Sequence, residues 1–125
     1  MIPAGEQASI DAGAAATIIA AMRVHAGVAD IAHLGCRALG NIAFSLVGRQ
    51  AVVDVGGIEI VIAAMRAHAD NAEVEKHGSF ALCCFARLPA GKAAIIAAGG
   101  RDVITAAMRH AAAKEIAEEA IALIS

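Results

Sequence analysis

Apolar residues in the middle of the chain recur at helical spacing. After the Gly56-Gly57 pair, four of them fall at positions i, i+3, i+4 and i+7, which predicts a helix over about 58–68. They are Ile58, Val61, Ile62 and Met65. A second stripe predicts a longer helix over about 72–88, which Pro89 ends because proline lacks a backbone N–H. Its members are Val74, Gly78, Ala81, Leu82 and Phe85. Residues 49–55 predict a short helix that the glycine pair ends, so this part of the chain is expected to form three helices.

The same pattern occurs more than once. The tetrapeptide Ala-Ala-Met-Arg stands at 20–23, 63–66 and 106–109, at two intervals of 43 residues. Gly13, Gly56 and Gly99 share one position of this frame, which is expected to run without insertion or deletion. A fixed period of about 40 residues is typical of helical solenoids. The sequence therefore predicts one all-α domain over 1–125. Its units are a partial repeat at 1–13, repeats at 14–56 and 57–99, and a partial repeat at 100–125.

Two segments resemble the armadillo (ARM) repeat family: VVDVGGIEIVIAAMRAHADN at 52–71 and GCRALGNIAFSL at 35–46. The resemblance covers nearly the whole chain. It implies a right-handed α-solenoid of three-helix repeats whose third helices line a concave groove. The related HEAT repeat has two helices per unit and no glycine corner, so it fits less well. Armadillo proteins bind other proteins, and the resemblance implies a non-enzymatic interaction module, or scaffold, that holds an extended peptide in the groove.

The groove residues expected from the resemblance lie on the two predicted third helices. They are Arg37, Asn41, Phe44, His77, Phe80, Cys84 and Arg87. Importin-like armadillo proteins carry a Trp and, four residues later, an Asn on this helix. Here Arg37 and Phe80 stand at the Trp positions, and of Asn41 and Cys84 only Asn41 matches, so recognition of nuclear signals is not expected. Phe and Arg are enriched at binding hot spots. The alternative is that Phe44 and Phe80 turn inward and the remaining residues form a solvated face.

The two partial repeats suggest a different function. Natural solenoids protect their ends with polar caps, and none is recognisable here. The chain is then a piece of a longer array, or it associates with other copies through its uncapped ends to form a homo-oligomer. The residues expected to carry self-association are Ile121, Leu123 and Ile124.

Composition and charge exclude other classes of protein. The chain is 59% hydrophobic, yet its uncharged stretches at 12–22 and 38–48 are about half the roughly 20 residues that cross a bilayer, so no membrane partner is expected. Residues 1–10 do not read as a signal peptide. A net charge of −2 offers no broad basic surface to nucleic acid. The odd number of cysteines favours a reduced, intracellular setting in the cytoplasm or nucleus; they are Cys36, Cys83 and Cys84.

No catalytic, cofactor or metal site is expected from the motifs. Arg23, Arg66 and Arg109 recur with the repeat near helix C-termini, where the backbone dipole favours a cation, so a structural role is the simpler interpretation. His25 and His68 recur in the same way, with His110 one residue off. His77 and Cys84 share a helix face, but zinc needs more ligands, and the only additions are Cys36 and His33. The protein is therefore not expected to be an enzyme.

Overall fold

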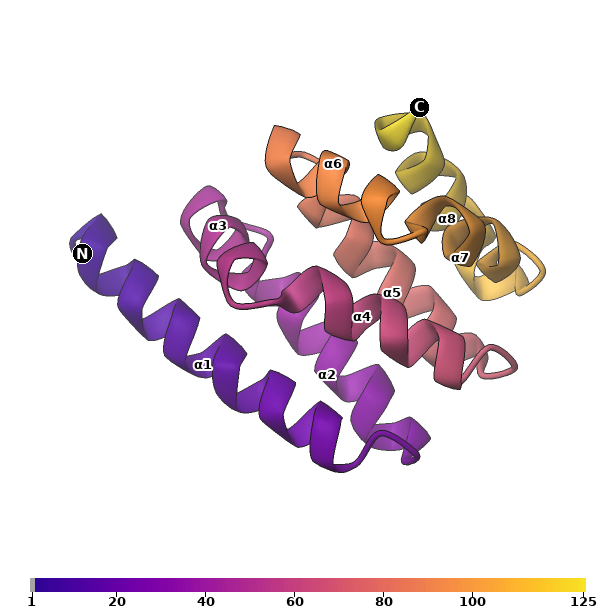
Figure 1. Ribbon diagram of the computed structural model, residues 1–125, viewed down its shortest axis with the longest axis horizontal. Coiled ribbons are helices and arrows are strands. Elements are labelled where there is room, and N and C mark those ends of the chain that lie inside the picture. Colours follow the sequence, from indigo (N-terminus) through magenta and orange to yellow (C-terminus); the bar gives the residue numbers. More distant parts are fainter. Residues whose placement is uncertain (1) are drawn as a thin grey trace.

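The helices that the periodicity predicts are present in the computed structural model, which describes residues 2–125. These residues form eight α-helices and no strand, so the protein is all-α (Figure 1). The bounds are α1 Ala4–Val24, α2 Ala29–Ile42, α3 Leu46–Asp54, α4 Gly57–Ala67, α5 Ala72–Phe85, α6 Pro89–Ala97, α7 Gly100–Ala107 and α8 Ala111–Ile124. None of the helices in this part of the chain has the length and apolar character needed to cross a membrane.

The helix ends follow from local capping groups. The Ser45 hydroxyl accepts a hydrogen bond from the Gly48 amide at 3.1 Å, which starts α3 three residues before the predicted start at 49. The Asn71 side chain caps α5 in the same way, through the Val74 amide at 3.0 Å. The predicted role of Pro89 is wrong. The helix α5 ends at Phe85, and Pro89 opens α6, where the missing N–H costs nothing.

The helices form two layers. In one layer α5 lies between α2 and α8, and in the other α4 lies between α1 and α7 (Figure 1). The short helices α3 and α6 pack at the ends of these layers, α3 against α1 and α6 against α7 and α8. The core lies between the layers, where Met65, Leu82, Phe85 and Ile104 are at most 1% exposed.

Two adjacent glycines build the corner before α4, and two more build the corner before α7. The first of each pair has a left-handed backbone, with φ of 95° at Gly56 and 79° at Gly99. The second allows close approach: a Cβ at Gly57 would overlap the side chain and carbonyl of Val52, and Gly100 meets Ile95 in the same way.

Counted from short helix to third helix, the units are α1–α2, α3–α5 and α6–α8. The first unit lacks this corner. Gly13 is followed by Ala14, and α1 runs unbroken from Ala4 to Val24, so the predicted boundary between 1–13 and 14–56 is not a break in the helix. The Cβ of Ala14 explains the difference, because the tight corner seen elsewhere has no room for a Cβ at this position. The short helix and the second helix are therefore one continuous helix in the first unit.

The last unit is four residues shorter than the frame requires. The helix α5 begins 43 residues after α2, whereas α8 begins 39 residues after α5. The shortening falls in α7 and the loop after it, since α7 has 8 residues and α4 has 11. The helix α8 has 14 residues, as α2 and α5 do. The expectation that the frame runs without deletion is thus wrong. Residues of α8 correspond to residues of α5 that lie 39 positions earlier.

Candidate functional site

The exposed face of α2, α5 and α8 contains two adjacent hollows. The first has a volume of about 430 Å³ and the second about 320 Å³. The first is lined by Arg37, Asn41, Lys76, His77, Phe80, Ala112, Glu115, Ile116 and Glu119. The second is lined by Phe44, Arg49, Phe80, Cys83, Cys84, Arg87, Ile116 and Glu119. Because Phe80, Ile116 and Glu119 border both, the two hollows form one continuous depression, which we call the third-helix groove.

One helix position supplies a different side chain in each unit of this groove. Arg37 of α2, Phe80 of α5 and Glu119 of α8 correspond once the four-residue deletion is taken into account. A cation, an aromatic ring and an anion therefore follow one another across the groove. The two sides of the groove therefore carry opposite charges.

All seven predicted groove residues line the third-helix groove, but they are not equally accessible. Arg37, Asn41, Phe44 and Arg87 are exposed, His77 and Phe80 are half-buried, and Cys84 is buried with 4% exposure. Lys76 and the α8 residues at this surface were not predicted. The repeat frame is the signal that could have found Glu119, but the deletion before α8 shifts this frame by four residues.

The two phenylalanines differ. Phe44 is 74% exposed and projects from the end of α2, so it does not turn inward. Phe80 packs between helices: a Cβ added at Gly40 of α2 would lie 2.6 Å from the Phe80 ring. The alternative that both phenylalanines turn inward is therefore wrong for Phe44. It holds partly for Phe80, which is half-buried.

Some groove charges are engaged within the chain and others are not. Arg87 Nη2 lies 3.4 Å from Glu119 Oε1, in an exposed ion pair that contributes less than about 1 kcal/mol. Arg49 donates to the carbonyl oxygens of Ala43 and Phe44 at 3.1 and 3.2 Å, which holds the C-terminus of α2. Within residues 2–125, Arg37 takes part in no ion pair, so its guanidinium is available to a ligand.

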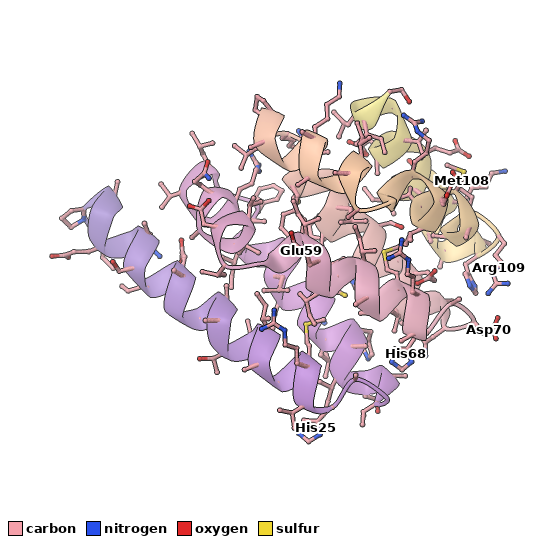
Figure 2. The ribbon with its side chains drawn as sticks, in the orientation of Figure 1. His25, Glu59, His68, Asp70, Met108 and Arg109 are labelled. Carbon is pink, nitrogen blue, oxygen red and sulfur yellow. The ribbon has the colours of Figure 1, made fainter. Side chains whose placement is uncertain are left out.

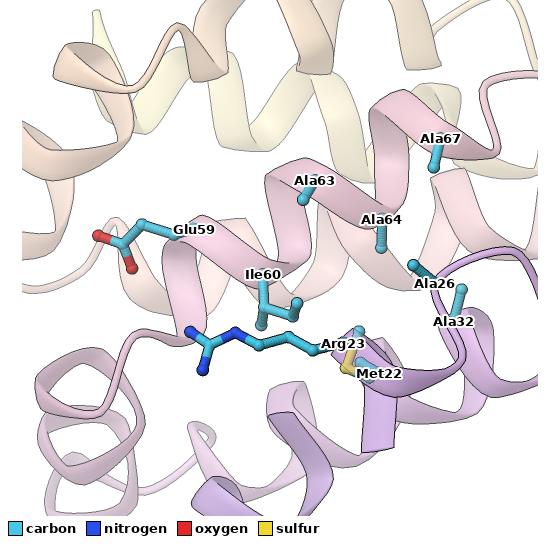
Figure 3. A pocket seen from close by; sticks show the side chains of 9 residues that line it. All are labelled: Met22, Arg23, Ala26, Ala32, Glu59, Ile60, Ala63, Ala64 and Ala67. Carbon is cyan, nitrogen blue, oxygen red and sulfur yellow. The ribbon is translucent and has the colours of Figure 1, made fainter. Parts of the chain in front are cut away.

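A further hollow of about 390 Å³ lies between α1, α2 and α4 (Figure 3). Its walls are mostly alanine, and the Arg23 side chain runs beneath Ile60 toward the start of α4 (Figure 3). Arg23 and Glu59 supply its only charged groups among the described residues. Small alanine side chains at a contact between helices leave such a gap. Because no polar groups converge on it, we assign no ligand to it.

The residues predicted to carry self-association are largely internal. Ile124 is 2% exposed and belongs to the core, at the position that Phe85 occupies in α5. Ile121 and Leu123 are partly buried against the same core. Ile124 therefore packs within the chain and offers no contact surface. A lysine at this position would place a charge in the core.

The recurrent histidines connect neighbouring units. A ring nitrogen of His68 donates to the Ala26 carbonyl at 2.8 Å, and His110 donates to the Ala69 carbonyl at 2.7 Å. Ala26 and Ala69 are 43 residues apart, so the same bond forms twice. His25 projects away from the ribbon at the end of α1 (Figure 2). The expected structural role thus includes a bond to the loop of the preceding unit.

The recurrent arginines have different partners. Arg66 donates to the Ala98 carbonyl at 3.0 Å, at the C-terminus of α6. Arg109 instead turns back to the preceding loop, where it contacts the Ala69 carbonyl and the Asp70 carboxylate, both at 2.6 Å (Figure 2). These contacts join consecutive units and leave neither arginine free for a partner.

The cysteines are unreactive in this environment. Cys36, Cys83 and Cys84 are buried free thiols. Burial raises the pKa of Cys36 to about 12 and that of Cys83 to about 11, and it raises the pKa of Cys84 as well. The thiolate is the nucleophile and the metal ligand, so all three behave as small apolar residues.

Comparison with models of known protein families finds no match, and comparisons with curated proteins and with solved structures find none either. The resemblance to armadillo repeats therefore rests on the sequence pattern alone.

Proposed function

We propose that this protein is a short armadillo-like, right-handed α-solenoid that acts as a non-enzymatic protein-interaction module. Its third-helix groove binds an extended segment of another protein. The observation that carries this proposal is the continuous depression across α2, α5 and α8, which Arg37, Asn41 and Phe44 line with exposed side chains. The glycine corners and the recurring bonds between units support the solenoid architecture.

The groove chemistry indicates which peptide fits. Packed helices lie about 10 Å apart, so three of them span about 20 Å, the length of roughly six residues of extended chain. Asn41 can donate to and accept from the backbone of such a chain. Arg37 favours an acidic side chain at one end, and Glu115 favours a basic one at the other, together with Glu119, which Arg87 also contacts. Phe80 provides apolar contact between them, and Phe44 adds more beside α2. We therefore propose a peptide with an acidic residue, an apolar middle and a basic residue.

The double variant Arg37→Glu, Phe44→Ala tests the groove. Both side chains are exposed, so the variant is expected to keep the helicity and the free energy of unfolding of the parent protein. Peptides selected from a random displayed library against the parent protein should lose at least about tenfold in affinity for this variant, as is typical of hot-spot residues. Fluorescence anisotropy with the selected peptides measures the change.

A matched control removes comparable groups from another surface. In the double variant Arg23→Glu, Leu46→Ala, a cation and an exposed apolar residue are lost outside the groove, and peptide affinity should not change. Equal binding by the groove variant and the parent, or equal losses in both variants, would contradict the proposal.

Self-association is a second candidate, favoured by exposed apolar side chains on α1 and α2. Leu34 is 52% exposed and Val24 is 77% exposed. At the position that corresponds to Leu34, α5 carries His77, which contacts the preceding unit by stacking on His33. Leu34 therefore lies on the side of the stack where units meet, and a second copy can cover it.

The single variant Leu34→Lys tests this second candidate. If copies associate through this face, the average molar mass of the parent protein in solution rises with concentration. Leu34→Lys should lower it to the mass of the monomer without loss of helicity. Light scattering over a range of concentrations measures the molar mass of both proteins. A parent protein that stays monomeric throughout would exclude this function and leave peptide binding unaffected.

A further inference from the structure

His33 and His77 do not follow the repeat, yet the fold brings them together. At the position of His33 the other two third helices carry Lys76 and Glu115, and at the position of His77 they carry Leu34 and Ile116. A repeated packing requirement therefore does not explain either histidine. Their rings nevertheless stack between α2 and α5, with centroids 5.8 Å apart and planes inclined by 22°.

Carboxylates accompany both histidines. Glu73 Oε2 lies 3.4 Å from His77 Nε2, one helical turn away on α5. Asp30 Oδ1 lies 3.7 Å from His33 Nε2 on α2. One ring nitrogen of each histidine and one carboxylate oxygen of Glu73 lie within 4.8 Å of one another. In addition, His33 Nδ1 is buried without a hydrogen-bond partner within residues 2–125, and burying such an atom is costly.

We propose that His33, Glu73 and His77 form a binding site for a divalent transition metal of the zinc class. Two imidazoles and one carboxylate are a known zinc ligand set, and a water molecule or a ligand fills the fourth position. Zinc–ligand bonds of about 2.0–2.1 Å place tetrahedral ligand atoms about 3.3 Å apart. The distance between Glu73 Oε2 and His77 Nε2 already has about this value, and rotation of the His33 side chain can close its remaining distances, which are at most 4.8 Å.

Charged side chains surround the proposed ligands. Burial lowers the pKa of His77. Glu73 acts in the opposite direction on this pKa, while Lys76, His33 and Arg37 add to the lowering. Lys76 and Arg37 also repel a metal ion, so we expect weaker binding than at a structural zinc site, which has four protein ligands.

The position of the site gives the metal a defined role. His33 belongs to one unit and Glu73 and His77 to the next, so a bound ion cross-links α2 and α5. His77 also lines the third-helix groove, so a bound ion would lie beside whatever occupies the groove. A carboxylate or imidazole of a ligand can occupy that position. The metal site itself does not depend on the peptide-binding proposal.

Titration of the tag-free protein with Zn²⁺ by isothermal calorimetry tests the site. We expect one saturable site per chain, and a Co²⁺ form whose visible absorption indicates tetrahedral nitrogen and oxygen ligands without a thiolate charge-transfer band. His33→Ala, His77→Ala and Glu73→Gln should each weaken binding by more than about tenfold. Glu73 is exposed, so Glu73→Gln tests coordination with little effect on the fold.

His25→Ala is the matched control, because His25 is exposed on α1 and outside the cluster, and binding should be unchanged. Three results would overturn the proposal. They are no saturable binding by the parent protein, undiminished binding by the double variant His33→Ala, His77→Ala, and a thiolate band that assigns the ion to cysteine. Circular dichroism of each variant establishes that loss of binding is not loss of the fold.

Discussion

Replacing Gly91 with alanine is expected to destabilise the protein by about 3 kcal/mol, a large part of the stability of a small domain. A Cβ at this position would overlap the carbonyl oxygen of Phe85, where α6 folds back onto the end of α5. Backbone atoms cannot move aside as a flexible side chain can, so the helices must separate. Gly48 meets the Ile42 carbonyl in the same way, and Gly48→Ala should have a similar effect. Urea unfolding followed by circular dichroism measures both.

The chain contains its own control for this experiment. Gly5 holds the same position in the repeat as Gly48 and Gly91, at intervals of 43 residues, but no atom lies within 4 Å of a Cβ built on it. Gly5→Ala should therefore leave the stability unchanged or raise it by up to about 0.5 kcal/mol, since alanine favours a helix. A loss of equal size in Gly5→Ala and Gly91→Ala would show that the contact with the Phe85 carbonyl is not the cause.

Glu75→Met is expected to stabilise the protein and to remove part of its pH dependence. Glu75 is 1% exposed, and its Oε2 atom is buried without a hydrogen-bond partner among the described residues. Burial raises the pKa of this carboxyl to about 8, against a smaller opposite effect of the Arg109 charge. Methionine has a similar length and carries no charge, so it fills the same space without the desolvation cost.

The direction of the pH effect follows from proton binding. Between about pH 5 and pH 8 the unfolded chain has lost the Glu75 proton while the folded protein retains it. The free energy of unfolding therefore falls as pH rises, by up to about 1.4 kcal/mol per pH unit, and levels off above the folded pKa. The difference between parent and Glu75→Met, measured by urea unfolding at several pH values, isolates this contribution from other titrating groups.

Glu118→Met provides the control, because this carboxylate is exposed on α8. Replacing Glu118 should change neither the free energy of unfolding nor its dependence on pH. If the difference between the parent and Glu75→Met were constant from pH 5 to pH 9, Glu75 would not be protonated in the folded state, and the burial of an acid would need another explanation.

The helices and their order were predictable because helical periodicity and glycine corners are local properties. Ile58, Val61, Ile62 and Met65 share one buried face as predicted. The fused α1 was not predicted, because it depends on the Cβ of a single residue, Ala14, at a position where the other units have glycine. The four-residue deletion was also missed, because Ala-Ala-Met-Arg precedes it and keeps the frame intact up to 109.

Burial between units was the least predictable property of the site. Glu75 stands beside the apolar stripe of α5 in the sequence, and nothing local indicates that neighbouring helices cover it. The encounter of His33 with His77 likewise depends on how α2 and α5 are aligned, since the two residues occupy different positions of the repeat. Groove residues such as Arg37 and Asn41 were predictable because the resemblance to armadillo repeats places them on the exposed face of a third helix.

The acceptors in the two histidine bonds between units are main-chain carbonyls, those of Ala26 and Ala69. Every residue type has such a carbonyl, so the bond places no demand on the identity of the acceptor's side chain. A gene duplication that adds one unit therefore creates this connection at once, with no compensating mutation in its neighbour. Arrays built in this way can gain or lose units while the residues facing the groove diverge independently.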